Sequence, residues 1–102
     1  MPATGTPSQL PPHQRGYVHI TSNTTTAVLA GPGILAAVVV NSGGGNNNLA
    51  TVYDANNGTT NPIAVLDTGA RGTILYEVRV QNGITVVTGG GANVPDLTVV
   101  FS

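Results

Sequence analysis

The stretch TILYEVRVQNGITVVT, residues 73–88, decides the fold class of this chain. Between residues 73 and 81 an apolar side chain stands at every even position, which is the two-residue period of a strand with one face in a core. The odd positions after residue 73, which we expect to be largely in water, are Leu75, Glu77, Arg79 and Gln81. Asn82-Gly83 and the β-branched residues after it are the strongest short-range signal for a hairpin. The stretch therefore predicts two antiparallel strands joined by a tight turn.

Short runs of the same kind recur along the chain, separated by Gly, Asn and Pro, as in β-sandwiches and barrels. No segment carries the period of a helix. The runs predicted as strands are Tyr17–Ser22, Thr25–Ala30, Ile34–Asn41, Leu49–Asp54, Ile63–Asp67, Thr73–Gln81, Ile84–Thr88 and Leu97–Phe101. We therefore predict an all-β fold: an eight-stranded antiparallel β-sandwich over residues 17–102. An extended, Pro-rich N-terminal arm over residues 1–16 precedes it and either orders against a neighbour or forms a free tail.

The composition excludes several classes of partner. The chain has 102 residues, of which 7% are charged, and a formal net charge of −1 with no lysine. Binding a nucleic-acid backbone requires clustered cations, so we expect no nucleic-acid partner. The longest apolar run, Ile34–Val40, is far shorter than the roughly 20 residues of a membrane helix, and no signal peptide is recognisable, so we expect no membrane association. Without cysteine, neither disulfides nor Cys-based metal sites can form.

No local pattern predicts catalysis. The acidic residues each fall in a different run, so their spacing offers no carboxylate pair for acid–base chemistry. They are Asp54, Asp67, Glu77 and Asp96. His13 and His19 have no further metal ligands near them in the sequence, and the two triple-glycine runs lack the lysine and the helix of a phosphate-binding loop. We expect a protein that is not an enzyme and that uses no cofactor and no metal.

One run breaks the one-sided pattern. Ile34–Val40 is apolar on both faces, which is unexpected for an antiparallel strand with one face in water. Small alanine side chains and covering loops would explain this, and so would an outer face packed on another subunit or protein, which we favour. Arginines are also enriched in interfaces. The candidate partner-binding residues are Pro11, Pro12, Arg15, Tyr17, Leu35, Ala37, Val39 and Arg71.

Four segments carry a resemblance to a known group of proteins: His19–Thr26, Thr51–Asp54, Gly72–Tyr76 and Gly83–Thr88. In their pattern of strand and turn residues they resemble small proteins of tailed bacteriophages. Such proteins are found among capsid decoration or cement proteins and related head-fibre or tail accessory modules. The resemblance implies a jelly-roll-like sandwich on the outer surface of the virion capsid. It also implies a homo-oligomer, either a dimer or a trimer, with the major capsid protein of the phage shell as partner and no catalytic residues.

On this resemblance we expect a structural virion protein that decorates and stabilises a phage capsid by binding across capsomer junctions. The alternative is a receptor- or glycan-binding module of a phage fibre or tail. Sugar sites commonly stack a ring on an aromatic side chain. Tyr76 and Phe101 fall on faces assigned to the core, which leaves Tyr17, Tyr53 and the Asn-rich loops for such a site.

Overall fold

The β-branched runs form strands in the computed structural model, which describes residues 15–42, 48–89 and 94–102. Each predicted run becomes one strand, with bounds that differ from the prediction by at most two residues. Residues 1–14, and with them Pro11 and Pro12 of the predicted arm, lie outside the described residues. The sandwich begins at Gly16, one residue earlier than predicted. No helix within the described ranges is long and apolar enough to span a membrane.

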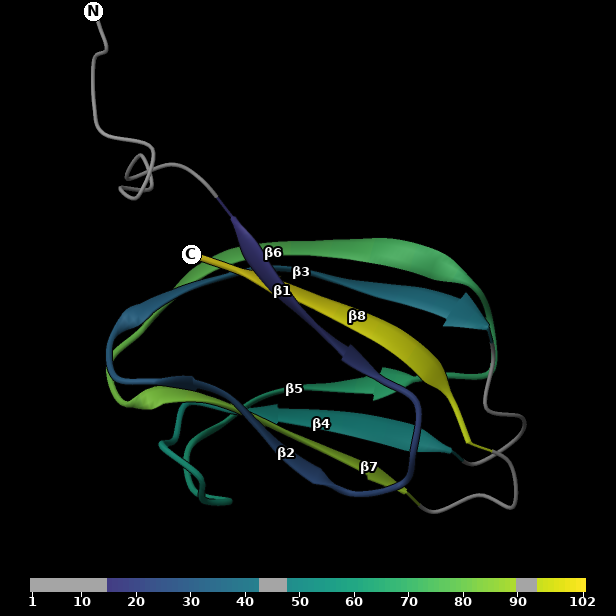
Figure 1. The fold of residues 1–102 in the computed structure, drawn as a ribbon, viewed down its shortest axis with the longest axis horizontal. Coiled ribbons are helices and arrows are strands. Elements are labelled where there is room, and N and C mark those ends of the chain that lie inside the picture. Colours follow the sequence, from purple (N-terminus) through teal and green to yellow (C-terminus); the bar gives the residue numbers. More distant parts are fainter. Residues whose placement is uncertain (1–14, 43–47, 90–93) are drawn as a thin grey trace, which may run out of the picture.

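The strands form two four-stranded antiparallel sheets that lie as two layers (Figure 1). Sheet A contains, in spatial order, β1 (Gly16–Ile20), β8 (Asp96–Phe101), β3 (Gly33–Ser42) and β6 (Gly72–Val80). Sheet B contains β2 (Thr25–Ala30), β7 (Gly83–Gly89), β4 (Leu49–Tyr53) and β5 (Pro62–Asp67). Every connection except that between β4 and β5 passes from one sheet to the other, and this strand order is that of a jelly roll. The predicted fold class, an eight-stranded jelly-roll-like β-sandwich, is therefore confirmed.

The facing surfaces of the two sheets enclose one apolar core. Alternation along each strand selects the side chains: on β8, Leu97 and Val99 are fully buried while Thr98 and Val100 point outward. On β6, Val80 is fully buried and Tyr76 packs against the core, whereas Ile74 and Val78 stay 41% and 37% exposed on this edge strand, although they pair with the buried Val38 and Leu35. The buried core residues are Ile20, Leu35, Val38, Val40, Ala50, Val52, Leu66, Val80, Ile84, Val86, Leu97 and Val99. Branched aliphatic packing therefore holds the layers together in a chain without disulfides.

The connection between β6 and β7 is not a hairpin, so the prediction from Asn82-Gly83 is wrong. β6 pairs with β3 in sheet A, whereas β7 pairs with β2 and β4 in sheet B. A type I′ hairpin turn needs positive φ at both central residues, and of this pair only Gly83 has it, with a φ of 148°. These residues carry the chain from one sheet to the other.

The carboxylate of Asp54, directly after β4, holds this crossing in place. It accepts hydrogen bonds from three consecutive backbone amides, at 3.1 Å from Gln81, 2.8 Å from Asn82 and 3.3 Å from Gly83. The amide of Asn82 is the largest cause that holds the pKa of Asp54 below its ordinary value of 3.8, and those of Gln81 and Gly83 add to it. The carboxylate therefore fills an anion-binding nest of amides within its own chain.

We expect Asp54→Asn to lower the free energy of unfolding at pH 7 by about 1–2 kcal/mol, because charge-assisted hydrogen bonds are lost at a solvent-accessible site. Since the folded-state pKa of Asp54 lies below its ordinary value of 3.8, the carboxylate stabilises the fold above that value. The contribution disappears as the pH falls through the folded-state pKa. Urea unfolding between pH 2 and 7 measures this, and the difference between the two proteins should shrink at the acidic end.

Asp67→Asn is the matched control, because within the described residues Asp67 accepts one hydrogen bond, at 2.9 Å from the amide of Gly69. It should cost less than Asp54→Asn at pH 7. Equal losses for the two variants would contradict the assigned role of Asp54.

We expect Gly83→Ala to destabilise the fold by roughly 3 kcal/mol or more, because no side chain fits at this crossing. A Cβ at residue 83 would lie 2.4 Å from the carbonyl oxygen of Leu29 and 2.9 Å from that of Ala55. Gly89→Ala is the control, since a Cβ there has nothing within 4 Å. Thermal unfolding should show a large loss for the first variant and a small change for the second.

Candidate interaction surface

The outward face of sheet A carries an apolar row that runs across all four strands. Tyr17 of β1 pairs with Val100 of β8, Val100 pairs with Ala37 of β3, and Ala37 pairs with Leu75 of β6. Directly paired residues point to the same face of a sheet. The two ends of the row are open to solvent, with Tyr17 71% and Leu75 75% exposed, while Ala37 in the middle is buried at 7%. The row is therefore an apolar strip with a small side chain in the middle and a large, accessible side chain at each edge of the sheet.

The outward face of sheet B is different in chemistry. The corresponding row consists of Thr25 of β2, Val87 of β7, Thr51 of β4 and Val65 of β5. Residues 54–61 also cover part of this face, because the hydroxyl of the fully buried Thr85 donates to the carbonyl oxygen of Ala55 at 2.8 Å. The matching row of sheet B is therefore half threonine, although Leu49 and Val65 are also exposed on this face, at 42% and 63%.

The grouping of Leu35 with Ala37 and Val39 on one outer face is wrong. Leu35 pairs with Phe101 of β8, but Ala37 pairs with Val100, so the register shifts by one residue at Ala36. The shift turns Leu35 toward the core, where it is 0% exposed. Val39, partly buried, shares the outward face with Ala37 through its pairing with Thr98. Of the three residues, Val39 is therefore partly accessible to a partner on the outer face, Ala37 points to that face but is nearly covered, and Leu35 is in the core.

The shift at Ala36 has a counterpart in β6. Leu35 pairs with Val78 and Ala37 pairs with Leu75. One residue of β3, Ala36, therefore lies opposite two residues of β6, Tyr76 and Glu77. Glu77 adopts a φ of 52°, which is rare for a residue with a side chain and marks a local irregularity in the strand.

Arg15 and Glu77 join the two edges of sheet A. Nη2 of Arg15 donates to both carboxylate oxygens of Glu77, at 2.9 and 3.0 Å, and Nη1 donates to the hydroxyl of Ser102 at 3.3 Å. Arg15 precedes β1 and Glu77 lies in β6, so the ion pair spans the ends of the intervening strands β8 and β3. Arg15 therefore lies beside the apolar row. Arg71 is exposed between β5 and β6 and does not belong to the row.

A second polar cluster lies at the other end of the same face. Nε2 of His19 contacts Oδ1 of Asp96, and the side-chain amide of Asn41 donates to Asp96 at 3.1 Å and to the hydroxyl of Thr98 at 3.0 Å. The hydrogen bond with His19 is the largest cause that keeps the pKa of Asp96 below its ordinary value of 3.8, and Asn41 adds to it. The cluster connects β1, β8 and β3 and fixes their outward side chains.

Leu75 is the functional candidate that sequence reasoning missed. The sequence pattern places Leu75 on the solvent face of its strand, together with Glu77 and Arg79. The structure confirms that Leu75 points outward. The available signal was a large apolar side chain at an otherwise polar position. Among the described residues, no group of three or more His, Asp or Glu side chains is placed to hold a metal ion.

Comparison of the chain with protein families, with characterised proteins and with solved structures finds no match.

We expect Leu35→Ala to cost about 2–5 kcal/mol, because it leaves a cavity in the core, whereas Leu75→Ala should change stability by less than about 0.5 kcal/mol. Urea unfolding of the two variants measures the difference. Similar losses for both would contradict the register shift at Ala36, which places one leucine inside and the other outside.

Proposed function

We propose that this chain is a structural virion protein that decorates a phage capsid, binding the major capsid protein across capsomer junctions through the outward face of sheet A. In this proposal it sits on the outer surface of the shell as a dimer or trimer. Three things support the proposal: the resemblance in strand and turn texture, the jelly-roll fold that many shell proteins share, and the apolar row on sheet A.

The observation that carries the proposal is the contrast between the two ends of the apolar row and its centre. Tyr17 and Leu75 are exposed by 71% and 75%, although both could contribute large apolar areas to a core. Aromatic and large aliphatic side chains that fill pockets on a partner commonly provide most of the binding free energy in an interface. The buried Ala37 between them keeps the strip low, so that a partner segment can lie across it.

Two polar contacts flank the apolar row. The Arg15–Glu77 ion pair lies on one side of the apolar row and the His19–Asp96 contact on the other. Side chains that already contact one another lose less freedom on binding, so less of the interaction energy is spent on ordering them.

The mechanism is the addition of contact area. A domain bound across a junction between capsomers must be released, or its contacts broken, before the capsomers separate. Because the domain binds the intact junction and not the separated capsomers, the stabilisation grows with its concentration relative to the dissociation constant. No chemical step is required of the chain.

We expect the protein to co-sediment with phage heads assembled without it, and Leu75→Asp to weaken this binding at least tenfold. A charge placed within an apolar contact has no partner and loses its water on binding, and tenfold corresponds to 1.4 kcal/mol. The measurement is the bound fraction after sedimentation over a range of protein concentrations.

Val65→Asp is the matched control, because Val65 is 63% exposed on the edge strand of the other sheet. It introduces the same charge and should leave binding unchanged. Failure of the unmodified protein to bind heads, together with binding on a glycan array, would replace the proposal with the receptor-binding alternative. Equal effects of the two substitutions would contradict the assignment to sheet A.

A further inference from the structure

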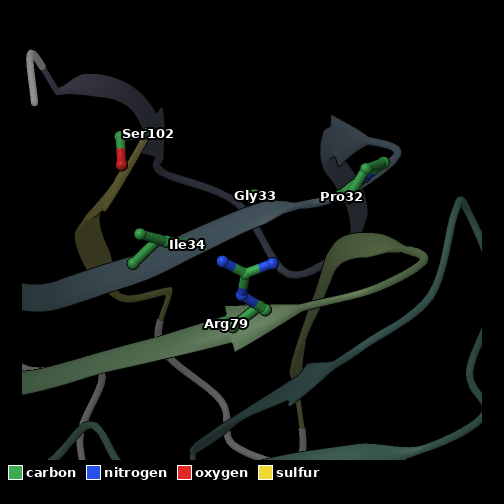
Figure 2. Close-up of a pocket in the computed structure, with 5 residues that line it drawn as sticks. All are labelled: Pro32, Gly33, Ile34, Arg79 and Ser102. Carbon is green, nitrogen blue, oxygen red and sulfur yellow. The ribbon is translucent and has the colours of Figure 1, made fainter. Parts of the chain in front are cut away.

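A small open pocket lies at one end of sheet A, beside the apolar row. It has a volume of about 360 Å³ and is lined by Pro32, Gly33, Ile34, Arg79 and Ser102. Figure 2 shows the side chain of Arg79 rising from β6 toward β3, with its guanidinium between Ile34 and Pro32. The backbone at Gly33 forms a tightly packed wall, since a Cβ there would lie 2.6 Å from the carbonyl oxygen of Ser102. The pocket thus combines one cation with an aliphatic side chain, a proline ring and a hydroxyl.

Arg79 forms no ion pair with any residue in the described part of the chain. Glu77 is the nearest acid in sequence, and it lies on the same outward face of β6, two residues away. Its carboxylate oxygens are both occupied by Nη2 of Arg15, at 2.9 and 3.0 Å. No hydrogen bond or ion pair joins Arg79 to another described residue. Within the described residues Glu77 therefore pairs with Arg15 and not with Arg79, whose guanidinium is available to a ligand.

We infer that this pocket binds a carboxylate carried on a short aliphatic chain, the chemistry of a glutamate side chain or of a small free acid. The planar guanidinium of Arg79 pairs with a carboxylate through parallel N–H donors. Ile34 and Pro32 provide apolar area for the carbons behind the carboxylate. A phosphate would gain less, because one arginine and an aliphatic wall match neither its charge nor its hydration. This site does not require the proposed capsid partner, so the two proposals fail independently.

The direct test is an NMR titration with butyrate, with acetate and inorganic phosphate as comparison ligands. The chain has three arginines, so the Nε–H signals of the three can be followed one by one. We expect saturable shifts at Arg79 Nε–H and at the amides of Gly33 and Ile34, with butyrate bound more tightly than acetate or phosphate.

Four variants test the mechanism. Arg79→Gln should weaken butyrate binding roughly three- to tenfold, the range expected for one partly exposed arginine–carboxylate pair. Arg71→Gln removes the same charge from an exposed residue outside the pocket and should have no effect. Arg15→Gln releases Glu77 to compete for Arg79 and should weaken binding about twofold or more. Adding Glu77→Gln to Arg15→Gln removes the competitor and should restore the affinity.

A second titration distinguishes the source of the carboxylate. A capped Gly-Glu-Gly peptide is compared with its Gly-Gln-Gly counterpart on the same protein. If the glutamate peptide binds and the glutamine peptide does not, the ligand is an acidic side chain of a protein partner. If butyrate binds and neither peptide does, the ligand is a small free acid. Phosphate binding as tight as butyrate, or an equal effect of Arg71→Gln and Arg79→Gln, would overturn the inference.

Discussion

The register shift at Ala36 is the constraint on which both faces of sheet A depend. β3 is the strand that pairs with β8 on one side and β6 on the other, so a change in its alternation affects the whole sheet. An uninterrupted alternation would place Leu35 on one face and Val38 and Val40 on the other. The shift brings all three into the core and leaves the small Ala37 outward. The same irregularity therefore places three large side chains of β3 in the core and a small one in the middle of the outward apolar row.

Much of this fold is local enough to be predicted from the sequence. Each β-branched run became a strand, because alternation and turn residues act over a few positions. The Asn82-Gly83 connection was predicted incorrectly for a physical reason: the carboxylate that captures its amides comes from Asp54, 28 residues earlier. A short-range turn signal contains no information about such a contact.

The candidate surface was predictable only in part. Tyr17, Ala37 and Val39 were assigned to an outer face by alternation and indeed point outward. Leu35 was misassigned because the irregularity at Ala36 depends on pairing with two other strands. The Arg15–Glu77 pair joins residues 62 positions apart, so neither its geometry nor the resulting freedom of Arg79 is visible in the sequence. Few charges are present in this chain, and tertiary structure decides which of them stay available.

The pairing of β1 with β8 also determines where the sandwich can be extended. Gly16 lies opposite Phe101, so the first and last strands begin and end side by side at one pole of the domain. Any polypeptide fused before Gly16 and any fused after Ser102 would leave from this shared pole. The domain is thus suited to carrying two attached segments together.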